Sequence, residues 1–437
     1  MKIPKRIAQT LMNSLKGGVV PRVGLPYITV GRKEEIDALL HDVEIIADGG
    51  ASFRFIVGKY GSGKSFLLQT IRNYVMAKNF VVVDADLSPE RRLQGTKGQG
   101  LATYKELIRN MSTKTKPEGG ALSLILDRWI SNVQQQTAEE AGLSVTDAAL
   151  PPLVEKRISA VIYSLNEMVH GFDFARLLTL YYQAHLSGDD ETKAKVLKWF
   201  RGEYNTKTEA RQELGVNIVI SDEDWYEYLK LFAAFLNQAG YAGMLVLIDE
   251  LVNIYKIPNA ITRQYNYEKI LTLYNDAMQG KAQHLGFILC GTPQCMEDPR
   301  RGVYSYEALR SRLAEGHFTG DHKDLLSPMI RLQPLTMEEM LILVEKLADI
   351  HAGLYEYPQI VQAQDMVDFI EIEFARIGAD THITPREVIR DFIQVLDIIY
   401  QNPNVKVRSL LGSEAFSYAQ NAVLEEASDS QFAEFDI

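Results

Sequence analysis

Apolar residues follow two patterns along the chain, and the first is a set of short continuous runs. Such runs are typical of strands buried on both faces of a parallel sheet, and they occupy residues 53–57, 80–87, 244–250 and 285–292. A helical segment, FLLQTIRNYVMAKN, separates the first two runs. Strand, helix and strand in succession predict a right-handed crossover and therefore an α/β fold with a parallel sheet.

The second pattern is a helical periodicity, which covers most of the remaining chain. Residues 88 to about 240 show helical periodicity and little strand pattern, so they predict a long helical insertion of the size of a subdomain. The insertion closes at Ser221-Asp222-Glu223-Asp224, a capping-box-like start for a helix over 225–237. A further helix is predicted over about 261–279.

Both ends of the chain are helical as well. Apolar residues spaced four apart predict a short amphipathic helix over 7–15, and a second helix is expected over 33–47. In the last third, Thr336-Met337-Glu338-Glu339 and Thr384-Pro385-Arg386-Glu387 have the pattern of capping boxes. Each box opens a predicted helix, so this third of the chain is expected to be helical.

The loop after the first predicted strand carries the strongest chemical signal. It matches the pattern GxxxxGK[ST] in full, with the residues Gly58-Lys59-Tyr60-Gly61-Ser62-Gly63-Lys64-Ser65. Its glycines let consecutive backbone N–H groups turn inward around phosphate, and the following helix adds its partial positive charge. We expect Lys64 to neutralise the β- and γ-phosphates and Ser65 to ligate Mg²⁺. A chance match in a glycine-rich turn is disfavoured, because a strand precedes the loop and a helix follows it.

An acidic pair ends the third apolar run and supplies the expected partner of this loop. Asp249 is predicted to hold Mg²⁺ through water, and Glu250 to polarise the attacking water. Two carboxylates at the end of an apolar strand are costly unless a cation or ligand lies near them. Acids also end strands in ordinary loops, but together with the phosphate loop the pair predicts an ATPase rather than a protein that only binds ATP.

Composition and charge exclude several classes of protein. The 437 residues are 46% hydrophobic and 24% charged, which fits a globular protein of two or three domains. No apolar run approaches the roughly 18 residues of a membrane helix, and the start lacks the continuous apolar stretch of a signal peptide. The two cysteines make no disulfide framework, so a cytoplasmic protein is expected. Cys290 is interpreted as a buried small residue and Cys295 as a loop thiol.

The charge is unevenly distributed around a formal net value of −11. Residues 1–33 hold seven Lys or Arg and no carboxylate, whereas residues 409–437 hold six carboxylates and no Lys or Arg. The two ends fit either docking arms for charged partners or solvated termini.

With these motifs the chain resembles the AAA+ ATPases. Val30-Gly31-Arg32 looks like the N-terminal box that flanks the adenine in initiator- and STAND-like members, which implies nucleotide contacts for Gly31 and Arg32. Thr292 stands where the family keeps a polar residue that helps to orient the water. Leu309-Arg310-Ser311-Arg312-Leu313 resembles the segment that projects an arginine finger into a neighbouring subunit. By that match Arg312 is the finger and Arg310 the second choice; two solvated arginines are the alternative.

Two further positions enter through the same resemblance. Arg386, in the first turn of a predicted helix, resembles the second sensor of a lid domain, and a plain helix cap is the alternative. Asp84 resembles the residue that restrains the catalytic glutamate, but Asp86 fits nearly as well.

A closer resemblance covers most of the chain. The sequence is similar to the ATP-binding P-loop proteins of BREX-type bacteriophage exclusion systems. The residues that carry this resemblance are GGVVPR at 17–22, GKYGSGKSF at 58–66, RRLQG at 91–95, LIRNM at 107–111, LVLIDELVNIYKI at 245–257 and ITPREVIRDFIQVLD at 383–397. The resemblance implies a bacterial defence ATPase encoded beside helicase-, methylase- or nuclease-type partners.

One departure bears on DNA binding. DNA-binding initiators of this class usually end in a winged-helix domain, but fewer than forty residues follow the helix expected at about 385–400, and they are acidic. Contacts with double-stranded DNA would then come from the basic N-terminal arm, the insertion or a ring pore. Arg91, Arg92 and Lys97 are the best candidates for a pore or effector contact, with solvated loop cations as the alternative.

We therefore expect an AAA+-type P-loop ATPase with ATP and Mg²⁺ as cofactors, which acts as a homo-oligomer on or beside DNA in anti-phage defence. A STAND-like nucleotide-dependent switch and a helicase-loading or transposition ATPase are the alternatives. The expected parts are a basic arm with the adenine-side box at 1–32, an ATPase core at 33–330 with the insertion at about 88–240, a helical lid at 331–412 and an acidic tail at 413–437.

Overall fold

The computed structural model describes residues 3–314, 324–376, 384–405 and 407–411. The chain divides into two compact units. The core unit comprises Glu34–Val57 and Ile71–Arg331, and the lid unit comprises Met1–Lys33, Gly58–Thr70 and Leu332–Ile437. The predicted acidic tail, 413–437, lies outside the described residues.

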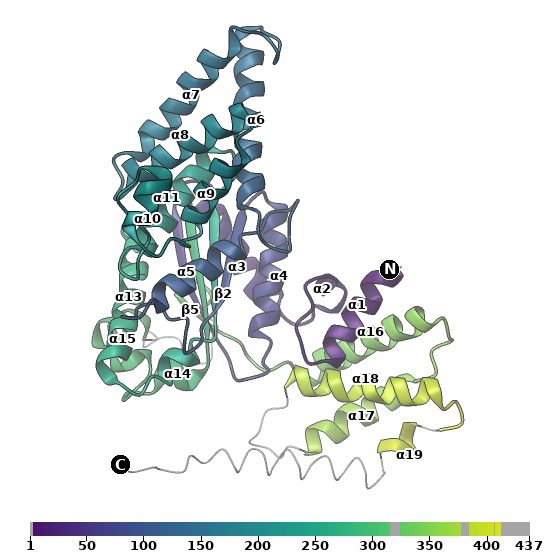
Figure 1. Ribbon diagram of the computed structural model, residues 1–437. Coiled ribbons are helices and arrows are strands. Elements are labelled where there is room, and N and C mark those ends of the chain that lie inside the picture. Colours follow the sequence, from purple (N-terminus) through teal and green to yellow (C-terminus); the bar gives the residue numbers. More distant parts are fainter. Residues whose placement is uncertain (1–2, 315–323, 377–383, 406, 412–437) are drawn as a thin grey trace. The chain divides into compact units, whose positions relative to one another are not determined.

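A parallel sheet of five strands forms the centre of the core unit (Figure 1). Its order is β2-β3-β4-β1-β5. The strands are β1 (Ala51–Val57), β2 (Val81–Asp86), β3 (Met244–Asp249), β4 (Leu285–Gly291) and β5 (Met329–Arg331). The first four confirm the four apolar runs, whose residues are almost all buried. The α/β fold class is thus confirmed.

The register of the sheet aligns the carboxyl ends of its strands. Val57 pairs with Gly291, and Asp86 pairs with Asp249. Since all of the pairings are parallel, β1 to β4 end at one edge of the sheet. The phosphate loop follows β1 in the chain, and the acidic pair ends β3.

Helices of the core unit contact individual strands of the sheet. α13 contacts β1, α5 contacts β2 and α11 contacts β3. Helices outside the insertion are α3 (Lys33–Ala47), α4 (Lys64–Ala77), α12 (Val252–Tyr255), α13 (Ala260–Met278), α14 (Pro293–Glu297) and α15 (Glu307–Leu313), with a 3-10 turn at Val303–Ser305.

The helical insertion lies between β2 and β3 and confirms the predicted helical stretch. It consists of α5 (Gln99–Arg109), α6 (Leu122–Ala141), α7 (Leu150–Leu165), α8 (Gly171–Ser187), α9 (Asp190–Phe200), α10 (Lys207–Leu214) and α11 (Trp225–Gln238). Edge-to-face aromatic pairs such as Trp129–Phe235 and Phe174–Phe232 join its helices. One continuous hydrophobic cluster includes both these rings and the sheet, so the insertion packs as part of the core unit.

The capping box expected at 221–224 is not formed. Asp224 is the N-cap of α11, but its carboxylate accepts hydrogen bonds from the Ser221 backbone N–H (2.8 Å) and hydroxyl (2.9 Å) instead of capping α11. The neighbouring Asp222 caps another helix, α5, by accepting the backbone N–H groups of Gly98 (2.8 Å) and Leu101 (2.7 Å). Tertiary contacts across the insertion therefore override the local capping pattern.

The lid unit is a helical cluster built from segments far apart in the sequence. Its helices are α1 (Lys5–Lys16), α2 (Leu25–Ile28), α16 (Met337–Tyr355), α17 (Ala363–Arg376), α18 (Pro385–Gln401) and α19 (Val407–Leu411). Both expected capping boxes, at Thr336 and Thr384, are present.

The first helix packs within the lid unit through its apolar face. The apolar face of α1, including Leu11 and Leu15, is buried in the cluster formed with α16 and α18. Lys16 pairs with Asp397, whose hydrogen bond raises the pKa of the lysine. Packing and charge thus hold the basic helix within the lid unit.

Among the described helices, none combines the length and the apolar character that a membrane span requires.

Candidate functional site

The phosphate loop leaves β1 and turns through two left-handed glycines. Gly61 has φ +76° and Gly63 has φ +94°, values that residues other than glycine rarely adopt. A Cβ at Gly61 would also lie 2.8 Å from the Cβ of Thr384. Both the backbone conformation and the close approach therefore require glycine at position 61.

The polar groups of the loop are arranged for an anionic ligand. The Lys64 ammonium donates hydrogen bonds to the carbonyl oxygens of Gly58 (2.8 Å) and Lys59 (2.9 Å), and so folds back over the loop. The Ser62 hydroxyl is buried and has no hydrogen-bond partner within the described residues. A buried polar atom without a partner is costly, so the loop fits a ligand rich in oxygen atoms such as a triphosphate. Ser65 follows in the first turn of α4.

The N-terminal box lies against the same loop within the lid unit. The buried Arg32 guanidinium donates a hydrogen bond to the carbonyl oxygen of Ser62 (3.2 Å). Gly31 has φ +66°, and a Cβ there would lie 2.5 Å from the carboxyl carbon of Glu339. Arg32 thus lies next to the phosphate loop, whereas Gly31 lies against Glu339 of α16.

The lid helix α18 also reaches the loop. The guanidinium carbon of Arg386 is 5.0 Å from the centre of the Tyr60 ring. The lid unit therefore brings together the phosphate loop, the N-terminal box and Arg386. The contact between Arg386 and Tyr60 has no signal in the sequence.

The acidic pair lies in the core unit, where the backbone holds it in an unusual conformation. Asp249 is buried at the end of β3, and its Oδ1 accepts the backbone N–H of Glu250 (2.8 Å). Glu250 has φ +62°, in the left-handed region. Side chains in this region carry strain that often marks functional sites.

A third carboxylate joins this acidic pair. Asp86 is in register with Asp249 on the neighbouring strand. Burial, reinforced by the carboxylates of Asp249, Asp84 and Glu250, raises the pKa of Asp86 to about 6. A cluster of this kind favours a bound proton on Asp86. Among the described residues, no three acidic, histidine or cysteine side chains form a group that could hold a metal ion by themselves.

Of the two aspartates left open by the sequence, Asp84 is held by other groups. It lies 3.3 Å from Arg72 in an ion pair, and the Asn110 side-chain amide donates to its carboxylate (3.3 Å) and to its backbone carbonyl (2.9 Å). Asp86 is the aspartate that is paired in register with Asp249, and its proximity to Glu250 favours it for the restraining role.

Thr292 begins a short helix directly after β4. Its hydroxyl oxygen accepts the backbone N–H of Cys295 (3.3 Å), and the Cys295 sulfur accepts the backbone N–H of Thr292 (3.1 Å). The interpretation of Cys295 as a loop thiol is therefore wrong: the side chain is buried and completes a capping box on α14. The hydroxyl proton of Thr292 is not used by this capping bond, in which the oxygen only accepts.

The two finger candidates lie on α15 in different surroundings. Arg310 forms an ion pair with Glu307 (2.7 Å). Arg312 is exposed and donates a hydrogen bond to the backbone carbonyl of Ala308 (2.7 Å). Its positive charge has no carboxylate partner among the described residues, which suits a cation that acts on another subunit.

A protein-family match covers most of the chain. A family model described as BREX system ATP-binding protein BrxC/D matches residues 3–415. The chain belongs to this family. Among solved structures, the Orc1 protein of Aeropyrum pernix in complex with DNA gives a TM-score of 0.41 at 11% identity, over 92% of this chain and 67% of that chain. No curated protein matches the chain.

The loop that follows β2 in this BREX-family chain is held from several sides. The side-chain oxygen of Asn266 accepts the backbone N–H groups of Leu93 and Gln94, both at 3.0 Å. The guanidinium of Arg91 donates to the carbonyl oxygen of Asp86 (2.9 Å). Arg91 thus stabilises the edge of the sheet, and this contact makes it a weaker candidate for a pore contact than the sequence suggests.

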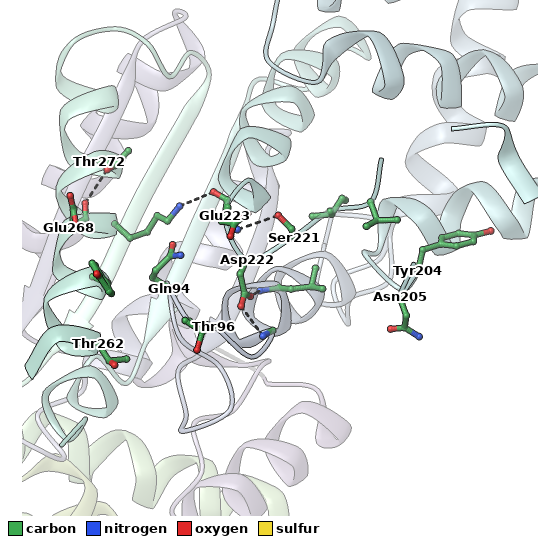
Figure 2. A pocket seen from close by; sticks show the side chains of 17 residues that line it. Gln94, Thr96, Tyr204, Asn205, Ser221, Asp222, Glu223, Thr262, Glu268 and Thr272 are labelled. Atoms are coloured by element: carbon green, nitrogen blue, oxygen red, sulfur yellow. Dashed lines mark hydrogen bonds between the residues drawn. The ribbon is translucent and has the colours of Figure 1, made fainter. Parts of the chain in front are cut away.

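Beside this loop, the BREX-family chain has an open polar pocket of about 790 Å³. Figure 2 shows Thr262, Glu268 and Thr272 of α13 on one side and the 221–223 segment on the other. Lys269 also lines the pocket, where burial lowers its pKa and its ammonium donates to the carbonyl oxygen of Glu223 (3.2 Å). The sequence does not predict the pocket, because it is formed by segments of the insertion and by α13, which are far apart in the chain.

Proposed function

We propose that this BREX ATP-binding protein hydrolyses ATP with Mg²⁺. The observation that carries the proposal is the phosphate loop, with two glycines in a left-handed conformation, a lysine folded over it and the buried Ser62 hydroxyl. These groups suit phosphate oxygens. The acidic pair, Asp249 and Glu250, favours hydrolysis over binding alone. Phosphate binding by itself does not require a glutamate in a strained backbone conformation, and such strain often marks functional sites.

Each residue has a role in this proposal. Lys64 neutralises the β- and γ-phosphates, and Ser65 and Asp249 would hold Mg²⁺. When bound, Mg²⁺ neutralises charge that develops on the phosphate oxygens. Glu250 accepts a proton from the attacking water, and the Thr292 hydroxyl orients that water.

The nucleotide-binding role extends to the lid unit. Arg32 and Gly31 line the adenine side, and Arg386 contacts the terminal phosphate. Two contacts support this part of the proposal: the Arg32 hydrogen bond to the loop and the position of Arg386 over Tyr60.

We further propose that the protein works in the bacterial cytoplasm as a homo-oligomer, with Arg312 as a finger in trans. The exposed guanidinium without a carboxylate partner among the described residues supports this role. Family membership supports a function in phage defence. The proposal places the protein there beside helicase-, methylase- or nuclease-type proteins and on or near double-stranded DNA.

The test compares ATP binding and ATP turnover in two variants. Lys64→Ala is expected to lose ATP binding, whereas Glu250→Gln is expected to bind ATP and to turn it over on the order of 10² to 10⁴ times more slowly, the usual contribution of a general base. Lys78→Ala, at an exposed lysine just after α4, is the matched control. Wild-type protein that retains ATP without turnover would support the nucleotide-dependent switch instead.

A further inference from the structure

Within the lid unit, the phosphate loop presents an exposed aromatic ring. Tyr60, the third residue of the loop, is 70% exposed, so its ring is not part of a hydrophobic core. The guanidinium carbon of Arg386 lies 5.0 Å from the ring centre. This distance is inside the roughly 6 Å at which a cation is attracted to the face of an aromatic ring.

The backbone that carries Arg386 is fixed beside the loop. Thr384 and Glu387 exchange both hydrogen bonds of the capping box, which stabilises the start of α18. The close approach of Gly61 to Thr384 places this helix start against the loop. What remains to be set is the direction of the long Arg386 side chain.

The ring is the group that sets this direction. Among the described residues, Arg386 forms no ion pair with a carboxylate, so Tyr60 is the partner that the structure gives its guanidinium. A cation without a counter-charge, held beside an anion-binding loop, remains available to a phosphate. Because the ring attracts it only weakly, the guanidinium is oriented without being neutralised.

We propose that Tyr60 is a positioning residue whose ring holds Arg386 ready for the terminal phosphate of ATP. This inference rests on the proposed ATPase function and adds a residue that the loop motif leaves unspecified. A side chain that is already oriented loses less rotamer freedom when it binds. The attraction expected for an exposed pair corresponds to about a two- to fivefold change in an equilibrium constant.

A double-mutant cycle on ATP affinity, measured by titration calorimetry, tests the proposal. Tyr60→Leu is expected to weaken ATP binding about two- to fivefold. The same change in an Arg386→Met background is expected to have no effect, because the cation it positions is gone. Tyr60→Phe keeps the aromatic face and is expected to bind ATP as the wild type does. ADP affinity is expected to be unchanged by Tyr60→Leu, because ADP lacks the terminal phosphate.

Matched controls separate this coupling from a general effect of the substitutions. Tyr74→Leu and Arg390→Met change an exposed tyrosine of α4 and an exposed arginine of α18, and they are expected to leave ATP affinity unaltered. An equal loss from Tyr60→Leu with and without Arg386 would overturn the proposal, as would a loss of affinity in Tyr60→Phe. Because the cycle is measured on binding, a wild type that binds ATP without hydrolysing it would refute the proposed hydrolysis and leave this result interpretable.

Discussion

The left-handed backbone of Glu250 leads to a prediction about stability as well as activity. Residues with a Cβ lose about 1–2 kcal/mol in this conformation, whereas glycine adopts it freely and loses about 0.5–1 kcal/mol through its more flexible unfolded chain. At φ +62°, Glu250→Gly is therefore expected to be more stable than Glu250→Ala by between about 0 and 1.5 kcal/mol. Both variants lack the carboxylate, so the comparison isolates the backbone strain and the flexibility of glycine in the unfolded chain.

At a helical position, the same two substitutions are expected to have the opposite order of stability, with the glycine variant less stable than the alanine variant. Glu268 is an exposed residue within α13, and glycine in a helix is about 1 kcal/mol less stable than alanine. The difference between the two pairs is thus expected to be about 1 to 2.5 kcal/mol.

Urea unfolding followed by tryptophan fluorescence measures this difference. All three tryptophans, Trp129, Trp199 and Trp225, lie in the core unit together with both glutamates, so the signal reports on the unit that carries the substitutions. A Glu250→Gly protein clearly less stable than Glu250→Ala would refute the assignment of strain to this position. Neither variant is expected to hydrolyse ATP.

Two further outcomes follow from the finger candidate and from the acidic cluster. Arg312→Ala alone is expected to hydrolyse ATP more slowly by a factor on the order of 10³ or more. When Arg312→Ala subunits are mixed with Glu250→Gln subunits, the rate is expected to exceed the sum of the rates of the separate proteins, because one of the mixed sites has both the finger and the glutamate. Because the pKa of Asp86 is raised to about 6 in the folded protein, the stability that its proton contributes is lost as the pH rises from about 4 to 6. Asp86→Asn is therefore expected to gain stability relative to the wild type as the pH rises from about 4 to 6 in urea titrations, and a constant difference over this range would contradict the raised pKa.

The sequence predicts those parts of the fold that are local and repetitive. Four strands and most helices are encoded in apolar spacing, and the phosphate loop in a motif of eight residues. β5 is missed because three residues, Met329–Arg331, are too few to show a period. The order of the strands depends on pairings between distant segments, which spacing along the chain does not specify.

Errors in the prediction occur where a side chain has a distant or competing partner. Asp222 and Asp224 belong to a segment with the pattern of a helix start. Asp224 instead closes a turn with Ser221, and Asp222 caps α5, which begins more than a hundred residues earlier in the chain. Cys295 is a helix-capping residue because it meets Thr292 after the strand ends. Tyr60 and Arg386 are far apart in the sequence, so no local pattern predicts the contact between the ring and the guanidinium.

The lid unit is completed late in the synthesis of the chain. Its first helix and its phosphate loop are made early, but α16 and α18 are translated after the whole insertion. Both helices pack on α1, and the start of α18 lies against the loop. A nascent chain therefore carries the glycine turn before it carries the helices that support it. Productive binding of nucleotide is expected only once the ribosome has made the segment beyond residue 385, which keeps unfinished copies from engaging ATP.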